Sequence, residues 1–253
     1  VYVTRSTATN TFYRYSISGN SWTTLTNTPQ VTNYHSFVYV SGVDKYYLFR
    51  GNGNYDIWTY NTTGNTFASI IEPPAALSTG ANLTYSGGDV YLIRGTSTNF
   101  YGYDVATNVW TTLTVAPGNI AGEQKAVVAG GSIYYFAANN TTAFYSYSIA
   151  GNSWTTLTAA PAAINGGGSL AYPGSGDYIY ATRGGNLGTF SRYSISGNSW
   201  SDVAVADLPT NILMGIGSRI LSDGTDIYAF TGSTGKPKLY KYVIGTDTWS
   251  VVG

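Results

Sequence analysis

A phrase of eight residues recurs along the chain and constrains its fold more than any other feature. It first reads Tyr-Ser-Ile-Ser-Gly-Asn-Ser-Trp, at residues 15–22. Two further copies are nearly identical, and three weaker copies keep the first Tyr and end on a large aromatic residue. The copies begin at Tyr15, Tyr60, Tyr103, Tyr147, Tyr193 and Tyr242. Because the spacing is 45, 43, 44, 46 and 49 residues, one structural unit is used six times.

Other features recur at fixed distances from this phrase. An apolar residue stands three positions before each first Tyr, and a second Tyr lies 12 to 14 positions upstream of it. Tight polar turns precede the second Tyr, as in residues 86–89 (Ser-Gly-Gly-Asp). Each unit therefore reads as four short strands joined by turns that favour hairpins. The repeat predicts an all-β fold, a six-bladed β-propeller of four-stranded blades, with one domain over residues 1–253.

The units resemble kelch repeats. A kelch blade has an apolar first strand, a second strand that ends in a Gly pair, a Tyr in the third strand and a Trp soon after it. The chain is similar to this pattern over nearly its whole length, and the central propeller domain of galactose oxidase shares it. The resemblance implies the propeller fold. It does not imply copper oxidase chemistry, which needs a Cys-modified Tyr and two His ligands, because the chain has no Cys and a single His, His35.

The first unit is shorter than the others. From 24 to 28 residues separate each phrase from the next second-strand Tyr, whereas only Val1 precedes Tyr2. We therefore expect five complete blades and a first blade without its innermost strand, 23 strands in all. Either the chain is cut from a longer protein, which is the interpretation we favour, or its first blade has three strands. We expect the gap to be open or filled by residues outside this numbering.

The large aromatic residues that end the phrases are expected to be buried at equivalent positions between neighbouring blades. They are Trp22, Phe67, Trp110, Trp154, Trp200 and Trp249.

Composition argues against several functions. The 12 basic and 12 acidic residues cancel, so no global field attracts nucleic acid. No apolar run approaches the ~20 residues of a membrane helix, so we expect no membrane insertion. The single His and the absence of Cys leave no evident metal site, and the only glutamates, Glu72 and Glu123, fall in separate loops. We expect no catalytic residues, no cofactor and no enzymatic activity.

One set of residues is explained by neither turns nor core. Arginine replaces the first Gly of the kelch pair in three units, and a further Arg stands at the same place in the partial first unit. These residues are Arg5, Arg50, Arg94 and Arg183. If equivalent positions share one face of a propeller, these residues surround the channel mouth, where guanidinium groups suit capture of carboxylate or sulfate. The competing interpretation is that each Arg stacks on a Tyr or caps loop carbonyls within its own blade.

The polar loops beside these arginines complete the candidate binding face. They contribute Asn52, Asn54, Tyr55 and Asn186. The poverty in Lys and Glu, with abundant Thr, Asn, Ser and Gly, favours an extracellular or cell-surface location. We therefore expect a binding or structural module that holds a protein partner or assembles with its own copies. A lectin-like module that binds glycans is the alternative, and a glycan-active enzyme is a third possibility.

Overall fold

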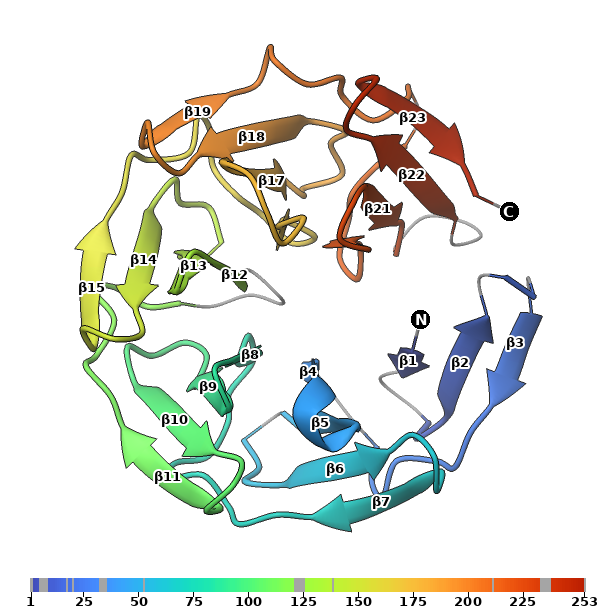
Figure 1. Ribbon diagram of the computed structural model, residues 1–253, viewed down its shortest axis with the longest axis vertical. Coiled ribbons are helices and arrows are strands. Elements are labelled where there is room, and N and C mark those ends of the chain that lie inside the picture. The colour runs from blue at the N-terminus through green and yellow to red at the C-terminus, as the bar shows by residue number, and fades with distance from the viewer. Residues whose placement is uncertain are drawn as a thin grey trace. The chain divides into compact units, whose positions relative to one another are not determined.

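The described part of the chain forms 23 β-strands and one short 3-10 helix, arranged in six antiparallel sheets (Figure 1). The computed structural model describes residues 2–4, 9–16, 18–19, 21–31, 36–51, 53–120, 126–137, 139–210, 212–232 and 238–252. The chain divides into two compact units, Val1–Val115 and Ala116–Gly253, with three sheets each. Among the described residues, no helix has the length and apolarity needed to cross a membrane.

The first unit contains blades 1 to 3. Blade 1 consists of β1 (Tyr2–Thr4), β2 (Phe12–Ser16) and β3 (Ser21–Thr24). Blade 2 consists of β4 (Phe37–Val40), the 3-10 helix η1 (Ser41–Val43), β5 (Lys45–Phe49), β6 (Ile57–Asn61) and β7 (Thr66–Ser69). Blade 3 consists of β8 (Asn82–Ser86), β9 (Asp89–Ile93), β10 (Phe100–Asp104) and β11 (Val109–Thr112).

The second unit contains blades 4 to 6. Blade 4 consists of β12 (Ala126–Ala129), β13 (Ser132–Phe136), β14 (Phe144–Ser148) and β15 (Ser153–Thr156). Blade 5 consists of β16 (Ser169–Ala171), β17 (Tyr178–Thr182), β18 (Phe190–Ser194) and β19 (Ser199–Ser201). Blade 6 consists of β20 (Arg219–Ser222), β21 (Ile227–Phe230), β22 (Leu239–Val243) and β23 (Thr248–Val251).

The sheets confirm the predicted fold class, an all-β six-bladed β-propeller. Within every sheet the strands are neighbours in sequence order, and five sheets have four strands. Blade 1 has three, in the order β1-β2-β3, so the expectation of a short first blade is also confirmed. That residues 1–253 form a single domain remains a prediction.

The repeated phrase is the hairpin between the last two strands of each blade. Its first and last aromatic residues face each other across the hairpin, as Tyr60 does with Phe67 and Tyr193 with Trp200. The turn places its fifth residue after the Tyr in the left-handed region, at φ between 43° and 59° in five blades. Asn and Asp tolerate this conformation better than other side chains. The residues are Asn65, Asn108, Asn152, Asn198 and Asp247.

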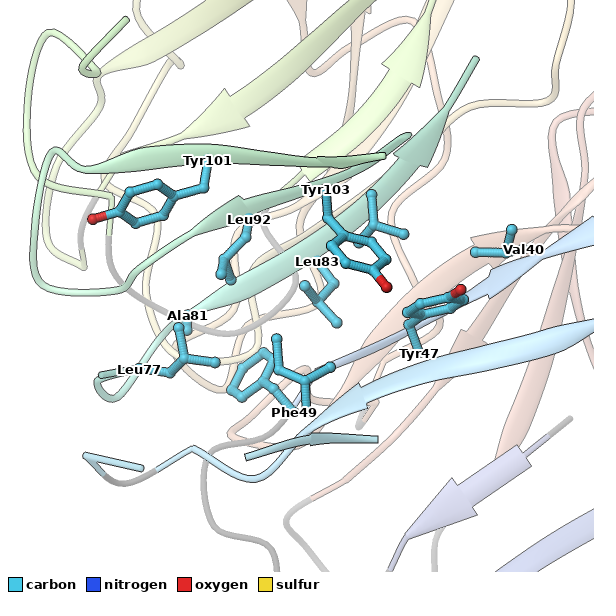
Figure 2. Close-up of a cluster of buried hydrophobic side chains, with 11 residues drawn as sticks. Val40, Tyr47, Phe49, Leu77, Ala81, Leu83, Leu92, Tyr101 and Tyr103 are labelled. Carbon is cyan, nitrogen blue, oxygen red and sulfur yellow. The ribbon is translucent and has the colours of Figure 1, made fainter. Parts of the chain in front are cut away.

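The core of each unit lies between neighbouring blades. In the first unit, Val40, Tyr47 and Phe49 of blade 2 pack against residues of blade 3 (Figure 2). The blade 3 side of this cluster includes Leu83, Leu92 and Tyr103, all at most 5% exposed. Burial of such side chains supplies most of the stability of a blade stack.

The large aromatic residues of the phrase are less buried than we expected. Trp22 is 54% exposed, and the equivalent residues of the other blades are half-buried. Each lies on the end strand of its sheet and packs on the paired Tyr. Several also contact the preceding blade, as Trp200 does with Phe136 and Trp249 with Phe190. Trp22 contacts Tyr13 and Tyr15 of its own blade, and among the described residues of its unit no preceding blade covers it.

Besides packing against the core clusters, these residues help to clamp one blade to the next. The side-chain oxygen of Asn198 accepts the backbone N–H of Thr158 at 2.9 Å, and Trp200 Nε1 donates to the carbonyl of the same Thr158 at 3.0 Å. In the same way, the Asp247 carboxylate accepts the backbone N–H of Ala206 at 2.7 Å, and Trp249 Nε1 donates to the carbonyl of Ala206 at 2.9 Å. The clamp therefore joins a hairpin turn to the segment that leaves the preceding blade.

Candidate functional site

We call Arg50, Arg94 and Arg183 the strand-exit arginines. Each directly follows the second strand of its blade and is followed by a glycine. Arg94 accepts the backbone N–H of Ser78 on its carbonyl, at 3.0 Å. The next residue, Gly95, has φ +80°, and a Cβ there would lie 2.4 Å from the backbone nitrogen of Ala81. Only glycine allows the loop that enters the blade to approach so closely. The Arg-Gly pair is therefore a local device that fixes the direction of the Arg side chain.

The side chain of each strand-exit arginine bonds to the equivalent loop, the one that enters its own blade. The Nε of Arg94 donates to the carbonyl of Ala76 at 2.7 Å. The Nε of Arg183 donates to Ala163 at 3.4 Å, and that of Arg50 to Val31 at 3.4 Å. These are the capping bonds of the competing interpretation, so Nε has a structural role. The terminal nitrogens of a guanidinium carry four further N–H donors.

Arg50 differs from the other two because it has an acidic neighbour. Its Nη1 forms an ion pair with Asp56 at 3.0 Å and also donates to the side-chain oxygen of Asn54 at 3.3 Å. The two charged side chains are 30% and 39% exposed, so solvent weakens the pair. Asp56 follows Arg50 by six positions and lies beside it in the structure. Its charge makes Arg50 the weakest anion-binding candidate of the three.

The polar loop residues have different environments. Asn54 donates to the carbonyl of Gly51 at 2.9 Å and is half-buried, whereas Tyr55 is 44% exposed. Asn186 is exposed in the left-handed conformation, at φ 60°. The structure thus brings Arg50 and Asn54 together in blade 2, and Arg183 and Asn186 into one loop of blade 5.

Two of the predicted binding residues, Arg5 and Asn52, lie outside the described residues. His35 and Glu123, which were not predicted to form a site, lie outside them as well. Arg50 and Arg94 belong to the first unit and Arg183 to the second, so their placement on one common face remains a prediction. Among the described residues, no group of three or more His, Cys, Asp or Glu side chains is placed to hold a metal ion.

A platform of three touching loops surrounds Arg183, and our sequence analysis missed it. Three loops meet there: 163–168 and 183–187 of blade 5, and 212–217 of blade 6. A Cβ on Gly167 would lie 2.1 Å from the carbonyl oxygen of Gly215, so these backbones touch. The bridge between Leu187 and Met214 joins the other pair of loops. The run of three glycines at 166–168 is the signal that could have revealed it, because adjacent glycines often mark close backbone approach.

In blades 5 and 6, the aspartate that directly precedes the second strand has a structural role. Asp177 accepts hydrogen bonds from the Ser194 hydroxyl at 2.5 Å and from the Ser196 backbone N–H at 2.8 Å. These bonds hold the pKa of Asp177 below its ordinary value. Asp226 similarly accepts the backbone N–H of Ile244 and pairs with Lys241 at 2.9 Å. Such aspartates tie the first turn of a blade to its last hairpin.

Comparisons with known proteins agree with this fold. A family model described as the DUF6242 beta propeller domain matches residues 104–251, more than half of the chain. The solved structure of YjhT is similar with a TM-score of 0.74 at 14% sequence identity, over 99% of this chain and 93% of that one. At this identity the likeness shows the fold alone. No curated protein matches the chain significantly. The matches support a β-propeller, and the narrower kelch resemblance remains an expectation.

Proposed function

The chain belongs to the DUF6242 β-propeller domain family, and we propose that it works as a non-enzymatic binding module outside the cell or on its surface. A β-propeller domain fits a binding or structural role. In our proposal the strand-exit arginines hold carboxylate groups of a protein partner or of a neighbouring copy. The composition, poor in Lys and Glu and rich in Thr, Asn, Ser and Gly, favours the extracellular setting.

The observation that carries this proposal is the shared geometry of Arg94 and Arg183. In each, Nε is held by a carbonyl of the entering loop, so the guanidinium is oriented before any ligand arrives. Both side chains are half-buried. A guanidinium whose direction is already fixed loses less entropy when it pairs with a carboxylate. Bidentate pairs of this kind are among the stronger polar contacts in proteins.

A lectin-like function is the second candidate, and the loop residues favour it. Tyr55 is 44% exposed, and an exposed ring can stack on a sugar. Asn186 presents its amide from a loop whose backbone is held by a bond from its own N–H to the carbonyl of Met214, at 3.1 Å. Neutral glycans would use these groups and would not need the arginines.

An array experiment separates the two candidates. The protein is applied to neutral, sialylated and sulfated glycans and to Glu-rich peptides. The proposed function predicts retention by the Glu-rich peptides, reduced at high salt because exposed charges are screened. Retention by neutral glycans that is insensitive to salt would support the lectin-like function instead.

A further inference from the structure

The three loops around Arg183 carry exposed apolar side chains. Leu187, Leu213 and Ile216 are 40%, 38% and 71% exposed. Ile216 rests against the backbone of Gly166, because a Cβ on that glycine would lie 2.9 Å from Ile216 Cγ1. Leu187 and Leu213 belong to the two loops that are joined by a backbone bridge. We call the surface made of Arg183, Leu187, Leu213 and Ile216 the Arg183 platform.

Two equivalent junctions between blades have small or polar residues at these positions. The backbone bridge of Leu187 with Met214 recurs between Asn54 and Leu77 and between Thr141 and Ile164, so the three junctions can be aligned. The residues that replace Leu187, Leu213 and Ile216 are Asn54, Ala76 and Thr79 in one junction and Thr141, Ala163 and Gly166 in the other. The apolar side chains are therefore a feature of this junction and not of the repeat. Exposed apolar clusters of this kind mark interaction sites.

A single charge lies among these apolar side chains. Arg183 is the one charged residue of the three loops. Its Nε and the side-chain amide of Asn165 both donate to the carbonyl of Ala163, at 3.4 Å, so the two side chains lie side by side. No acidic residue in the three loops competes for the remaining N–H donors of Arg183. The complementary ligand therefore carries a carboxylate next to an aliphatic side chain, which a protein segment can offer and a neutral glycan cannot.

The chain itself has a segment with this chemistry, directly after β19. Asp202 and Val203 are both exposed, and Val203 is 98% exposed. The segment contains an insertion. The carbonyl that receives the indole N–H of the next blade lies four positions after the Trp of the phrase in blade 4, at Thr158, but six positions after Trp200 in blade 5, at Ala206. We call Asp202 and Val203 the Asp-Val knob, since they project from a connection that is two residues longer.

We propose that the Asp-Val knob of a second copy of this protein occupies the Arg183 platform. The Asp202 carboxylate pairs with the Arg183 guanidinium, and Val203 packs on Ile216 and its apolar neighbours. The knob and the loop at 212–217 both lie on the connection between β19 and β20, so two copies related by a two-fold axis can exchange knobs. Two-fold dimers are the commonest homo-oligomers. This inference rests on the proposed function, because it uses Arg183 as a carboxylate-binding residue and names the neighbouring copy as the partner.

The small size of the contact predicts a weak dimer. Two knobs and two platforms involve far fewer side chains than a standard interface of about 1,600 Å², so we expect a Kd of about 100 µM. The dimer should be weaker at high salt, because the charges of Asp202 and Arg183 are solvent-accessible and are screened.

Sedimentation velocity between about 10 µM and 1 mM protein measures this association. The unmodified protein should dimerise as its concentration rises. Val203→Asp changes the knob and Ile216→Asp changes the platform, and each should weaken the dimer at least about tenfold. Both positions are exposed, so both variants should fold. Val115→Asp is the matched control, because Val115 is 56% exposed and lies outside both surfaces. Its dimer should stay within about twofold of that of the unmodified protein.

A double-mutant cycle tests whether Asp202 and Arg183 contact each other. Asp202→Asn and Arg183→Gln should each weaken the dimer about fivefold to tenfold. If the two side chains pair across the interface, combining both changes should weaken it little further, because either change alone already removes the pair. Losses that multiply in the combined variant would show that the residues act separately and would overturn the proposed pairing.

Two further results would overturn the proposal. One is a protein that stays monomeric up to about 1 mM. The other is a dimer that neither Val203→Asp nor Ile216→Asp weakens. Binding of a Glu-rich peptide, measured on the same preparations, separates this inference from the proposed function. A monomeric protein that still binds the peptide through Arg183 would overturn the knob as the partner and leave the proposed function standing, whereas loss of peptide binding as well would overturn both.

Discussion

Trp200 donates its indole N–H to the backbone carbonyl of Thr158, 3.0 Å away. The two residues belong to adjacent blades and stand 42 positions apart, close to one repeat. The Tyr193 hydroxyl completes the arrangement by donating to Asn198 at 2.8 Å. The repeated phrase of the sequence thus forms a clamp between blades, and its Trp acts through the indole N–H as well as through its ring.

The clamp predicts that Trp200→Phe destabilises the protein more than Trp22→Phe. Phenylalanine fits the position, because Phe67 occupies it in blade 2, but it leaves the carbonyl of Thr158 without its indole donor. We expect a loss of about 1 kcal/mol for Trp200→Phe and less than about 0.5 kcal/mol for the exposed Trp22. Urea denaturation measures both, and equal losses would show that the indole bond is unimportant.

Two glycines with positive φ offer a matched test of the Arg-Gly device. Gly87 has φ +63° with nothing within 4 Å of an added Cβ, so Gly87→Ala should cost about 1–2 kcal/mol for the left-handed conformation alone. Gly95→Ala adds a backbone clash at 2.4 Å and should cost about 3 kcal/mol or more. Thermal unfolding compares the two variants. A cost for Gly95→Ala no greater than for Gly87→Ala would contradict the close approach of the entering loop.

Blade 6 predicts a dependence of stability on acid pH. Hydrogen bonds from the Tyr242 hydroxyl and the Ala206 N–H hold the pKa of Asp247 below its ordinary value of 3.8. A lowered folded-state pKa stabilises the protein above the unfolded-state value, and this stabilisation is lost as pH falls through the folded-state value. Asp247→Asn, whose neutral amide oxygen accepts the same bonds, should lower stability at pH 7 and flatten the decline between about pH 5 and pH 2.

The reverse substitution is the control for this effect. Asn198 occupies the equivalent turn in blade 5, and Asn198→Asp should add an acid-dependent contribution that the unmodified blade lacks. Denaturant midpoints at a series of pH values measure both variants. Parallel pH profiles for Asp247→Asn and the unmodified protein would contradict the role assigned to the Asp247 carboxylate.

The blades could be predicted from the sequence because repetition reveals which positions are equivalent. The six frames located the hairpins, and the short stretch before Tyr2 located the three-stranded blade. Repetition does not reveal what equivalent positions contact. The clamp joins Thr158 to Asn198 across two blades, and no local pattern indicates that a turn Asn reaches the preceding blade. For the same reason the Trp residues were wrongly expected to be buried.

The candidate site was predicted in part. The shared position of Arg50, Arg94 and Arg183 could be read from the sequence, and so could capping of loop carbonyls as a competing interpretation. The ion pair of Arg50 with Asp56 depends on how a short loop folds back on itself, which spacing alone does not determine.

The affinity of the double variant Arg94→Gln, Arg183→Gln for a Glu-rich peptide tests the proposed function most directly. Glutamine keeps an N–H donor for the carbonyls of Ala76 and Ala163, so the fold should persist. It removes the positively charged guanidinium group that would bind a carboxylate. Arg14→Gln, an exposed third-strand change, controls for the loss of charge. We predict a loss of about tenfold or more in affinity for the double variant and less than about twofold for Arg14→Gln. Unchanged affinity of a folded double variant would contradict the proposal that these arginines bind the partner.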